Sequence, residues 1–247
     1  FGMNARQMNA WMLHGNGRKL LDEFYAGYGM LSFAGGNTGT QMGGWFRKEI
    51  KSTADLKGLK MRLGGGLVGD VMTKLGVVPQ SLPGGEIYQA LEKGTIDAAE
   101  WVGPYDDQKL GFNKVAPHYY YPGWWEGGPE VDFFINKKAF DALSPENKAI
   151  VAAASAQASV DMLAKYDARN PVALKQLIGA KIKLLPFTKD VLDASFKASQ
   201  EVYAENDAKS PEWKKIFADF RAFQRDQVAW FRVAESRFDS YMQTVKL

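Results

Sequence analysis

The chain has 247 residues, of which 46% are hydrophobic, and its formal net charge is +3. This size allows one or two packed domains of roughly 100–150 residues each. Nothing favours a nucleic-acid-binding protein, because the sequence has no run of lysine and arginine and no known recognition motif. The absence of cysteine excludes disulfides, thiolate metal sites and cysteine nucleophiles. No apolar stretch approaches the ~20 residues that cross a bilayer.

The first 40 residues predict two short helices and a strand. Residues 1–28 are expected to be helical in two pieces, with a break at 14–17, and residues 30–34 to form a short strand. The glycine-rich segment 35–39 is typical of a flexible turn. Because the chain opens on Phe1 within an apolar, helix-like segment, we expect that its natural N-terminal part is missing.

The next segment predicts a helical turn, a tight corner and a strand that ends on an arginine. Ser52 or Thr53 can cap the turn, and Gly58 can adopt the positive φ that closes it. Arg62 alternates with apolar neighbours, and three glycines behind it let a ligand approach its guanidinium. Such a guanidinium can clamp a carboxylate, although a surface or structural ion pair is the commoner role of an arginine in this position.

Alternating helices and strands follow these glycines. Helical spacing over 66–76 leads to a short strand at 77–79, an amphipathic helix over 86–94 with a glycine C-cap, and a strand that ends on Glu100 and Trp101. This order is typical of an α/β domain with a largely parallel sheet. Ligand sites of open α/β sheets gather at strand ends, so Glu100 is either a site residue or an exposed strand-end acid.

The second half of the chain predicts mostly helices. The expected elements are a helix over 105–116, an aromatic and glycine-rich segment over 118–128, strands over 131–136 and 182–185, a long helix from Pro145 that Pro171 kinks, and helices from Lys189 onward with a break near 210–211. Asp106 and Asp107 resemble an acidic pair at a helix N-terminus. Trp45 and Phe46 either pack in the core or line an apolar wall, and core packing is the commoner role of such residues.

Three segments in residues 55–100 carry a family resemblance: DLKGLKMR, LGVVP and YQALEKGTIDAAE. In this order they closely resemble the solute-binding proteins of tripartite ATP-independent periplasmic (TRAP) transporters, the DctP-like family. The resemblance extends from about Gln41 to the C-terminus. It implies a two-lobed α/β fold of the periplasmic-binding-protein type with a long bridging helix, a periplasmic location, no enzymatic activity and a membrane permease as partner. Roughly the first third of a mature family member would be absent.

The resemblance also implies how the chain is divided. The parts would be an incomplete lobe I (1–40 and 128–145), lobe II (41–127 and about 180–187), the bridging helix (146–179) and C-terminal helices (188–247). The glycine-rich turns at 35–39 and 127–129 are candidate hinges between the lobes.

The family resemblance assigns roles to five residues. Arg62 would hold the carboxylate of an organic acid. Gln41, Trp101 and Glu126 would contact both the substrate and a metal ion, and Glu100 would bind the metal. Trp101 would contribute its backbone carbonyl. From the residues alone, Glu126 could equally be a solvated acid in a packed aromatic turn, and Gln41 an ordinary polar residue at a strand start.

A cation is also expected from the charges. Glu100 and Glu126 beside a ligand carboxylate would place several negative charges against the single guanidinium of Arg62. Like charges at close range either force protonation or require a counter-ion. Oxygen donors favour Na⁺, Ca²⁺ or Mg²⁺ over zinc or copper.

The nature of the ligand follows from Trp101. Many family members have asparagine here, and tryptophan resembles the subgroup that binds small 2-oxo acids. We therefore expect a pyruvate-like 2-oxo monocarboxylate with Na⁺. The alternatives are Ca²⁺-dependent lactate binding and a metal-assisted lyase or aldolase. No nucleophile elbow, phosphate loop or His–acid pairing supports the enzyme.

The C-terminal stretch 213–247 carries more aromatic side chains than one helix on a small core needs. Packing onto the lobes would account for them. The alternative is a homodimer, in which these helices pack on, or exchange with, a second protomer.

Overall fold

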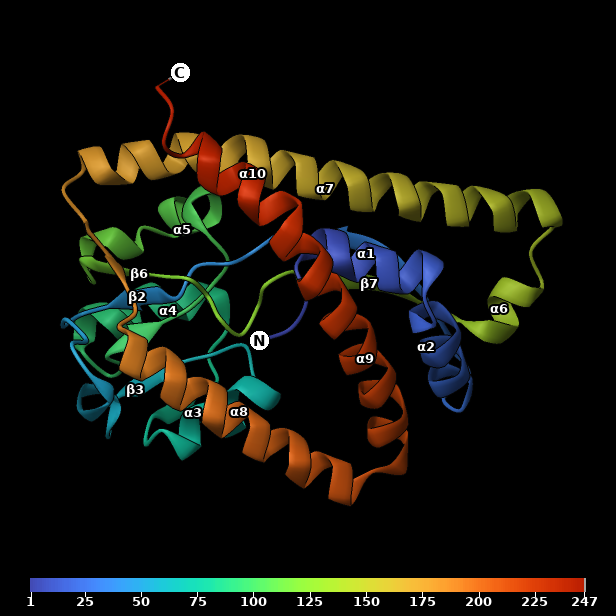
Figure 1. Cartoon of the computed structure of the whole chain (residues 1–247), viewed down its shortest axis with the longest axis horizontal. Helices are drawn as coiled ribbons and strands as arrows, with labels where there is room; N and C mark the ends of the chain where they lie inside the picture. The colour runs from blue at the N-terminus through green and yellow to red at the C-terminus, as the bar shows by residue number, and fades with distance from the viewer. Residues whose placement is uncertain (247) are drawn as a thin grey trace.

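The structure is a computed structural model that describes residues 1–246. Its strands form two separate sheets, and one 35-residue helix, α7 (Pro145–Gly179), extends along both (Figure 1). The remaining helices are α1 (Ala5–His14), α2 (Gly17–Ala26), α3 (Leu67–Lys74), α4 (Gly84–Lys93), α5 (Pro104–Leu110), α6 (Lys137–Asp141), α8 (Lys189–Lys209), α9 (Pro211–Val233) and α10 (Glu235–Met242). The strands are β1 (Met30–Asn37), β2 (Gly44–Phe46), β3 (Lys60–Arg62), β4 (Val78–Gln80), β5 (Ala98–Ala99), β6 (His118–Tyr121), β7 (Glu130–Asn136) and β8 (Lys183–Pro186). The predicted α/β class with a long helix is confirmed.

The smaller sheet pairs β1 with β7 in antiparallel orientation. The prediction that β1 ends at residue 34 and turns at 35–39 was wrong, because the strand continues to Asn37 with an irregularity in register between Ala34 and Gly36. A Cβ at Gly35 would overlap the ring of Phe133, and one at Gly36 would overlap the sulfur of Met162. These glycines therefore allow close packing against β7 and α7 rather than a turn.

The larger sheet has the strand order β4-β3-β5-β2-β6-β8. The strands β4, β3 and β5 pair in parallel, as predicted for this part of the chain. The sheet as a whole is mixed, since β2 is antiparallel to both β5 and β6. Trp45 of β2 lies opposite Ala99 and Tyr119, and its ring stacks on that of Tyr119 at 3.8 Å between centroids. The small residues of β5 leave room for the indole on that side.

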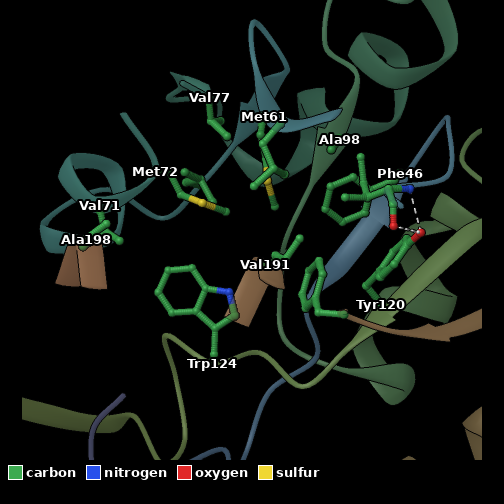
Figure 2. Packing of buried hydrophobic residues seen from close by; sticks show 14 of the residues in the cluster. Phe46, Met61, Val71, Met72, Val77, Ala98, Tyr120, Trp124, Val191 and Ala198 are labelled. Carbon is green, nitrogen blue, oxygen red and sulfur yellow. Dashed lines mark hydrogen bonds between the residues drawn. The ribbon is translucent and has the colours of Figure 1, made fainter. Parts of the chain in front are cut away.

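Helices cover both faces of the larger sheet, so this part of the molecule has three layers. On one face, β3 and β2 pack against α3 and α8 through a cluster that includes Met61, Met72, Val191 and Phe46 (Figure 2). On the other face, Ile87 and the rest of α4 pack with Trp45 in a second cluster. Trp45 and Phe46 are at most 1% exposed, which confirms that they are core residues.

The helix α7 joins the two sheets. Met162 contacts β1 at Gly36, and the Tyr166 hydroxyl donates to Asp106 of α5 at 2.6 Å. Pro171 lies within the helix and does not end it, as predicted. We propose that each sheet belongs to one lobe, with the boundaries given above.

One helix end differs from the sequence expectation and another matches it. The helix expected over 105–116 ends at Leu110, because Gly111 adopts a left-handed conformation with φ of 74°. The break expected near 210–211 is present between α8 and α9, where the Ser210 hydroxyl accepts the N–H of Trp213 at 3.1 Å. Within residues 1–246, no helix combines the length and apolarity that spanning a membrane requires.

The predicted corner at Gly58 gives a test of the local fold. Gly58 has φ of 74°, and within the described residues a Cβ there would contact nothing within 4 Å. We expect Gly58→Ala to lower the free energy of unfolding by about 1–2 kcal/mol, through backbone strain alone. Gly85 in α4 is equally open but helical, so Gly85→Ala should raise it by about 0.5–1 kcal/mol. Urea denaturation measures both, and equal effects would contradict the left-handed corner.

Candidate functional site

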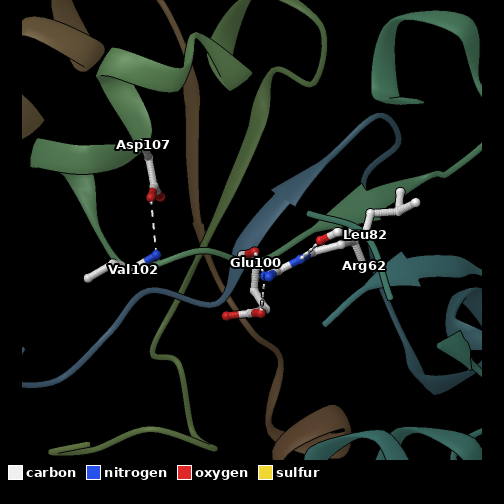
Figure 3. Close-up of polar contacts among 5 residues, drawn as sticks. All are labelled: Arg62, Leu82, Glu100, Val102 and Asp107. Carbon is white, nitrogen blue, oxygen red and sulfur yellow. Dashed lines mark hydrogen bonds and ion pairs between the residues drawn. The ribbon is translucent and has the colours of Figure 1, made fainter. Parts of the chain in front are cut away.

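Arg62 is the last residue of β3 and is held in place by three hydrogen bonds (Figure 3). Its Nε donates to the carbonyl of Leu82 at 3.3 Å. Its Nη1 donates to the backbone carbonyl of Glu100 at 2.8 Å and to the Glu100 carboxylate at 2.7 Å. The guanidinium also lies over the Trp101 ring, 4.9 Å from its centroid. Within the described residues these bonds use Nε and Nη1, and Nη2 makes no hydrogen bond.

Glu100 lies beside Arg62 because β5 and β3 are parallel neighbours. Ala99 pairs with Arg62, and the Glu100 N–H donates to the Arg62 carbonyl at 3.1 Å. Glu100 is only 3% exposed. Burial raises the pKa of Glu100 to about 8, the charge of Glu126 adds to the increase, and Arg62 opposes it. One guanidinium therefore does not offset the cost of two carboxylates in this place.

Gln41 and Glu126 are joined through their backbones. The Gln41 N–H donates to the Glu126 carbonyl at 3.0 Å, and the Gln41 carbonyl accepts the Gly123 N–H at 2.9 Å. The Gln41 side chain is buried, and its Nε2 donates to the Thr38 hydroxyl at 3.2 Å. Its Oε1 is buried and accepts no hydrogen bond from the described residues. Burial raises the pKa of Glu126 above its ordinary value, and the charge of Arg62 opposes part of this increase.

The pair of Arg62 and Glu100 and the pair of Gln41 and Glu126 lie close together at the ends of the strands. The Met42 N–H donates to the Val102 carbonyl at 3.0 Å, which ties the Gln41 segment to the segment after Glu100. A Cβ at Gly44 would lie 2.6 Å from the Ala99 carbonyl, so only glycine allows this approach. The structure thus brings all five residues expected at the site, Gln41, Arg62, Glu100, Trp101 and Glu126, to one edge of the larger sheet.

The donor atoms at this edge fit a hard cation. They comprise the carboxylates of Glu100 and Glu126, which have raised pKa values, and the buried amide oxygen of Gln41, which accepts no hydrogen bond within residues 1–246. An amide oxygen without a hydrogen-bond donor and two costly carboxylates are stabilised by the same positive charge. Among residues 1–246 no three His, Cys, Asp or Glu side chains are grouped to hold a metal ion. A cation here would therefore depend on amide and backbone oxygens as well.

Asp107 also lies in this region, although the sequence indicated only an acidic residue at a helix N-terminus and not a site residue. It lies in the first turn of α5, as expected for the acidic pair, but it is 1% exposed. It accepts hydrogen bonds from Trp45 Nε1 at 2.9 Å, from the Tyr119 hydroxyl at 2.7 Å and from the Val102 N–H at 3.2 Å. Burial raises the pKa of Asp107 to about 6, and these bonds oppose the increase. No sequence signal pointed to this role, since two of the donors come from distant strands.

The comparisons with known families and curated proteins point in one direction. A family model described as bacterial extracellular solute-binding protein, family 7 (DctP), matches residues 1–210. A monocarboxylate 2-oxoacid-binding periplasmic protein from Nostoc is 48% identical over 241 residues, which are 98% of this chain and 66% of that protein. The chain therefore spans just under two thirds of the length of this relative. A 2,3-diketo-L-gulonate-binding periplasmic protein from Escherichia coli is 34% identical over 116 residues, 44% of this chain and 33% of that protein.

Solved structures agree with these matches. A TRAP transporter solute-binding protein from Bordetella bronchiseptica superposes with a TM-score of 0.95 and 55% identity, over 98% of this chain and 71% of that one. It is described as a dimer with calcium and picolinate in one active site and an apo second site. A protein from Colwellia psychrerythraea holds calcium and pyruvate (TM-score 0.94, 41% identity, 98% and 74% covered). One from Pseudoalteromonas atlantica holds sodium and pyruvate (TM-score 0.92, 43% identity, 100% and 74% covered).

Proposed function

The chain belongs to family 7 of the bacterial extracellular solute-binding proteins, the DctP family, and we propose that it captures a small 2-oxo monocarboxylate together with a metal ion in the periplasm. Members of this family are substrate-binding components of transporters and not enzymes. The lyase or aldolase considered above is therefore set aside. The remaining partner would be the membrane permease of a TRAP transporter, to which the protein delivers its ligand.

One observation carries the proposal: a single guanidinium shares the strand edge with the buried carboxylate of Glu100, the half-buried carboxylate of Glu126 and a buried amide oxygen that accepts no hydrogen bond from the described residues. Arg62 would hold the ligand carboxylate through its open Nη2 edge. Gln41, Glu100, Glu126 and the carbonyl of Trp101 would hold the cation. When bound, the cation would balance the negative charges of the two carboxylates and attract the 2-oxo oxygen of the ligand. Gln41, Trp101 and Glu126 would then contact both the cation and the ligand.

Pyruvate with Na⁺ is the ligand pair that we propose, and lactate with Ca²⁺ is the alternative. Support for pyruvate comes from the relatives with 41% and 43% identity, which hold it with calcium and with sodium respectively. Carboxylate, amide and carbonyl oxygens suit either ion. A 2-hydroxy acid offers the same pair of oxygens as a 2-oxo acid, so the donor set is compatible with lactate as well.

We further propose a homodimer that uses the C-terminal helices. Five large apolar side chains on α9 and α10 are each more than half exposed: Val228, Trp230, Val233, Phe238 and Tyr241. Such a grouping of apolar side chains is typical of a protein interface. The Bordetella relative, described as a dimer, supports this proposal.

Thermal unfolding of the chelator-treated protein tests the ligand pair. We expect pyruvate and Na⁺ together to stabilise the protein by about 2.7 kcal/mol at a ligand concentration of 100 Kd. Each alone should give much less, since the cation and the carboxylate offset each other's charge. 2-Oxobutyrate should act like pyruvate if the chain length of the acid is of little importance.

Two other outcomes would change the proposal. Stabilisation only by lactate with Ca²⁺ would favour the alternative ligand pair. No stabilisation by any of these acids with either ion would contradict a 2-oxo or 2-hydroxy acid as the ligand.

A further inference from the structure

We infer that Asp107 is a positioning residue, which aims the backbone carbonyl of Trp101 at the cation. This inference rests on the proposed function, because it concerns the same site. Asp107 itself accepts the N–H of Val102, the residue after Trp101, and is not one of the proposed cation ligands.

The carboxylate of Asp107 is held rigidly from behind. Its Oδ2 accepts hydrogen bonds from Trp45 Nε1 and from the Tyr119 hydroxyl, at 2.9 and 2.7 Å. Both partners are fully buried and stack on each other in the core of the sheet. This leaves Oδ1, at a fixed place, to accept the Val102 N–H at 3.2 Å (Figure 3).

The bond to Val102 orients the carbonyl of Trp101, because the two groups belong to one peptide unit. A trans peptide is planar, and its N–H and C=O point in opposite directions. Fixing the Val102 N–H on Asp107 therefore turns the Trp101 oxygen away from α5. The negative charge of the acceptor also polarises the peptide and makes this oxygen a better cation ligand.

Val102 is also hydrogen-bonded to the segment that contains Gln41. The carbonyl of Val102 accepts the N–H of Met42 at 3.0 Å, and Met42 directly follows Gln41. Two of the proposed cation ligands, from segments 60 residues apart in the sequence, are thus aligned through Val102. Replacing a residue that hydrogen-bonds to a metal ligand and orients it usually lowers the metal affinity by about 10- to 100-fold.

The test compares Asp107→Asn with Tyr119→Phe. An amide cannot accept from all three donors and carries no charge, whereas Tyr119→Phe removes one donor and keeps the bond to Val102. We titrate Na⁺ or Ca²⁺, whichever stabilises the wild type, at saturating pyruvate. Asp107→Asn should raise the half-saturating cation concentration about 10- to 100-fold, and Tyr119→Phe should raise it less than about threefold. At saturating cation, the pyruvate affinity of Asp107→Asn should return to near the wild-type value.

A second measurement needs no variant. Hydrogen exchange of the wild type should show the Val102 amide protected before any cation is added. An equal increase in the half-saturating cation concentration in the two variants, or an unprotected Val102 amide, would overturn the inference while the proposed function stands. A wild type that binds no cation with pyruvate would overturn both, and the failure of the wild type itself distinguishes this case.

Discussion

Arg62→Ala is expected to weaken pyruvate binding at saturating cation by about 100-fold or more. Removing one partner of a buried, hydrogen-bonded charge pair costs about 2–5 kcal/mol or more. The Arg62 side chain is 12% exposed and that of its partner Glu100 is 4% exposed, so water cannot replace the guanidinium well. The variant also leaves Glu100 without its counter-charge. Isothermal titration calorimetry with pyruvate at a fixed, saturating cation concentration measures the loss.

Two variants serve as controls for this result. Arg62→Lys keeps the charge and loses the planar fork that bonds Leu82 and Glu100, so it should recover only part of the affinity. Arg47→Ala removes an exposed arginine just beyond β2 and should leave pyruvate binding unchanged. Wild-type affinity in Arg62→Ala would mean that another group holds the carboxylate.

The position of Arg62 could be predicted because the information is local. Gly58 closes a corner with positive φ, three residues of strand follow, and the arginine ends that strand. The neighbouring strand β5 ends at the same level, so Glu100 falls beside Arg62 by the geometry of parallel strands. That part of the site depends on spacing within a single stretch of the chain. The placement of Gln41 and Glu126 came from the family resemblance and not from their residue pattern.

Other features could not be predicted, because they depend on contacts between distant segments. The glycines at 35 and 36 have the composition of a turn, but they lie in β1, which pairs with β7, and they pack closely against Phe133 and Met162. The antiparallel orientation of β2 depends on its pairing with β5 and β6, which come more than 50 residues later in the chain. The bonds to Asp107 join donors that are 62, 12 and 5 residues away in the sequence. No helical or strand period encodes such a carboxylate.

The affinity for the cation is expected to fall about tenfold per pH unit as the pH drops below 8. Cation binding needs Glu100 deprotonated, and burial together with the charge of Glu126 raises the pKa of Glu100 in the cation-free protein to about 8. Each bound cation must then displace close to one proton at pH 7. Calorimetry in two buffers of different ionisation enthalpy measures that proton directly.

The stability of the cation-free protein should change with pH in the opposite direction. The ordinary pKa of a glutamate is 4.5, and the folded value for Glu100 is about 8, so the folded state binds more protons between these values. The stability from this group is therefore complete below pH 4.5 and is lost as the pH rises through 8. Glu130, with its pKa raised to about 7, contributes in the same direction. The melting temperature without cation should fall over this range while the gain from cation and pyruvate grows.

Glu126→Gln separates the electrostatic cause from other effects of pH. The charge of Glu126 is one of the causes that raise the pKa of Glu100, so removing it should move the pH midpoint of cation binding to lower pH. The variant also loses a proposed cation ligand, so its affinity at high pH should be weaker than that of the wild type. An affinity that stays constant between pH 6 and 8 in the wild type would mean that Glu100 is already ionised, and that Arg62 alone supplies the charge it needs.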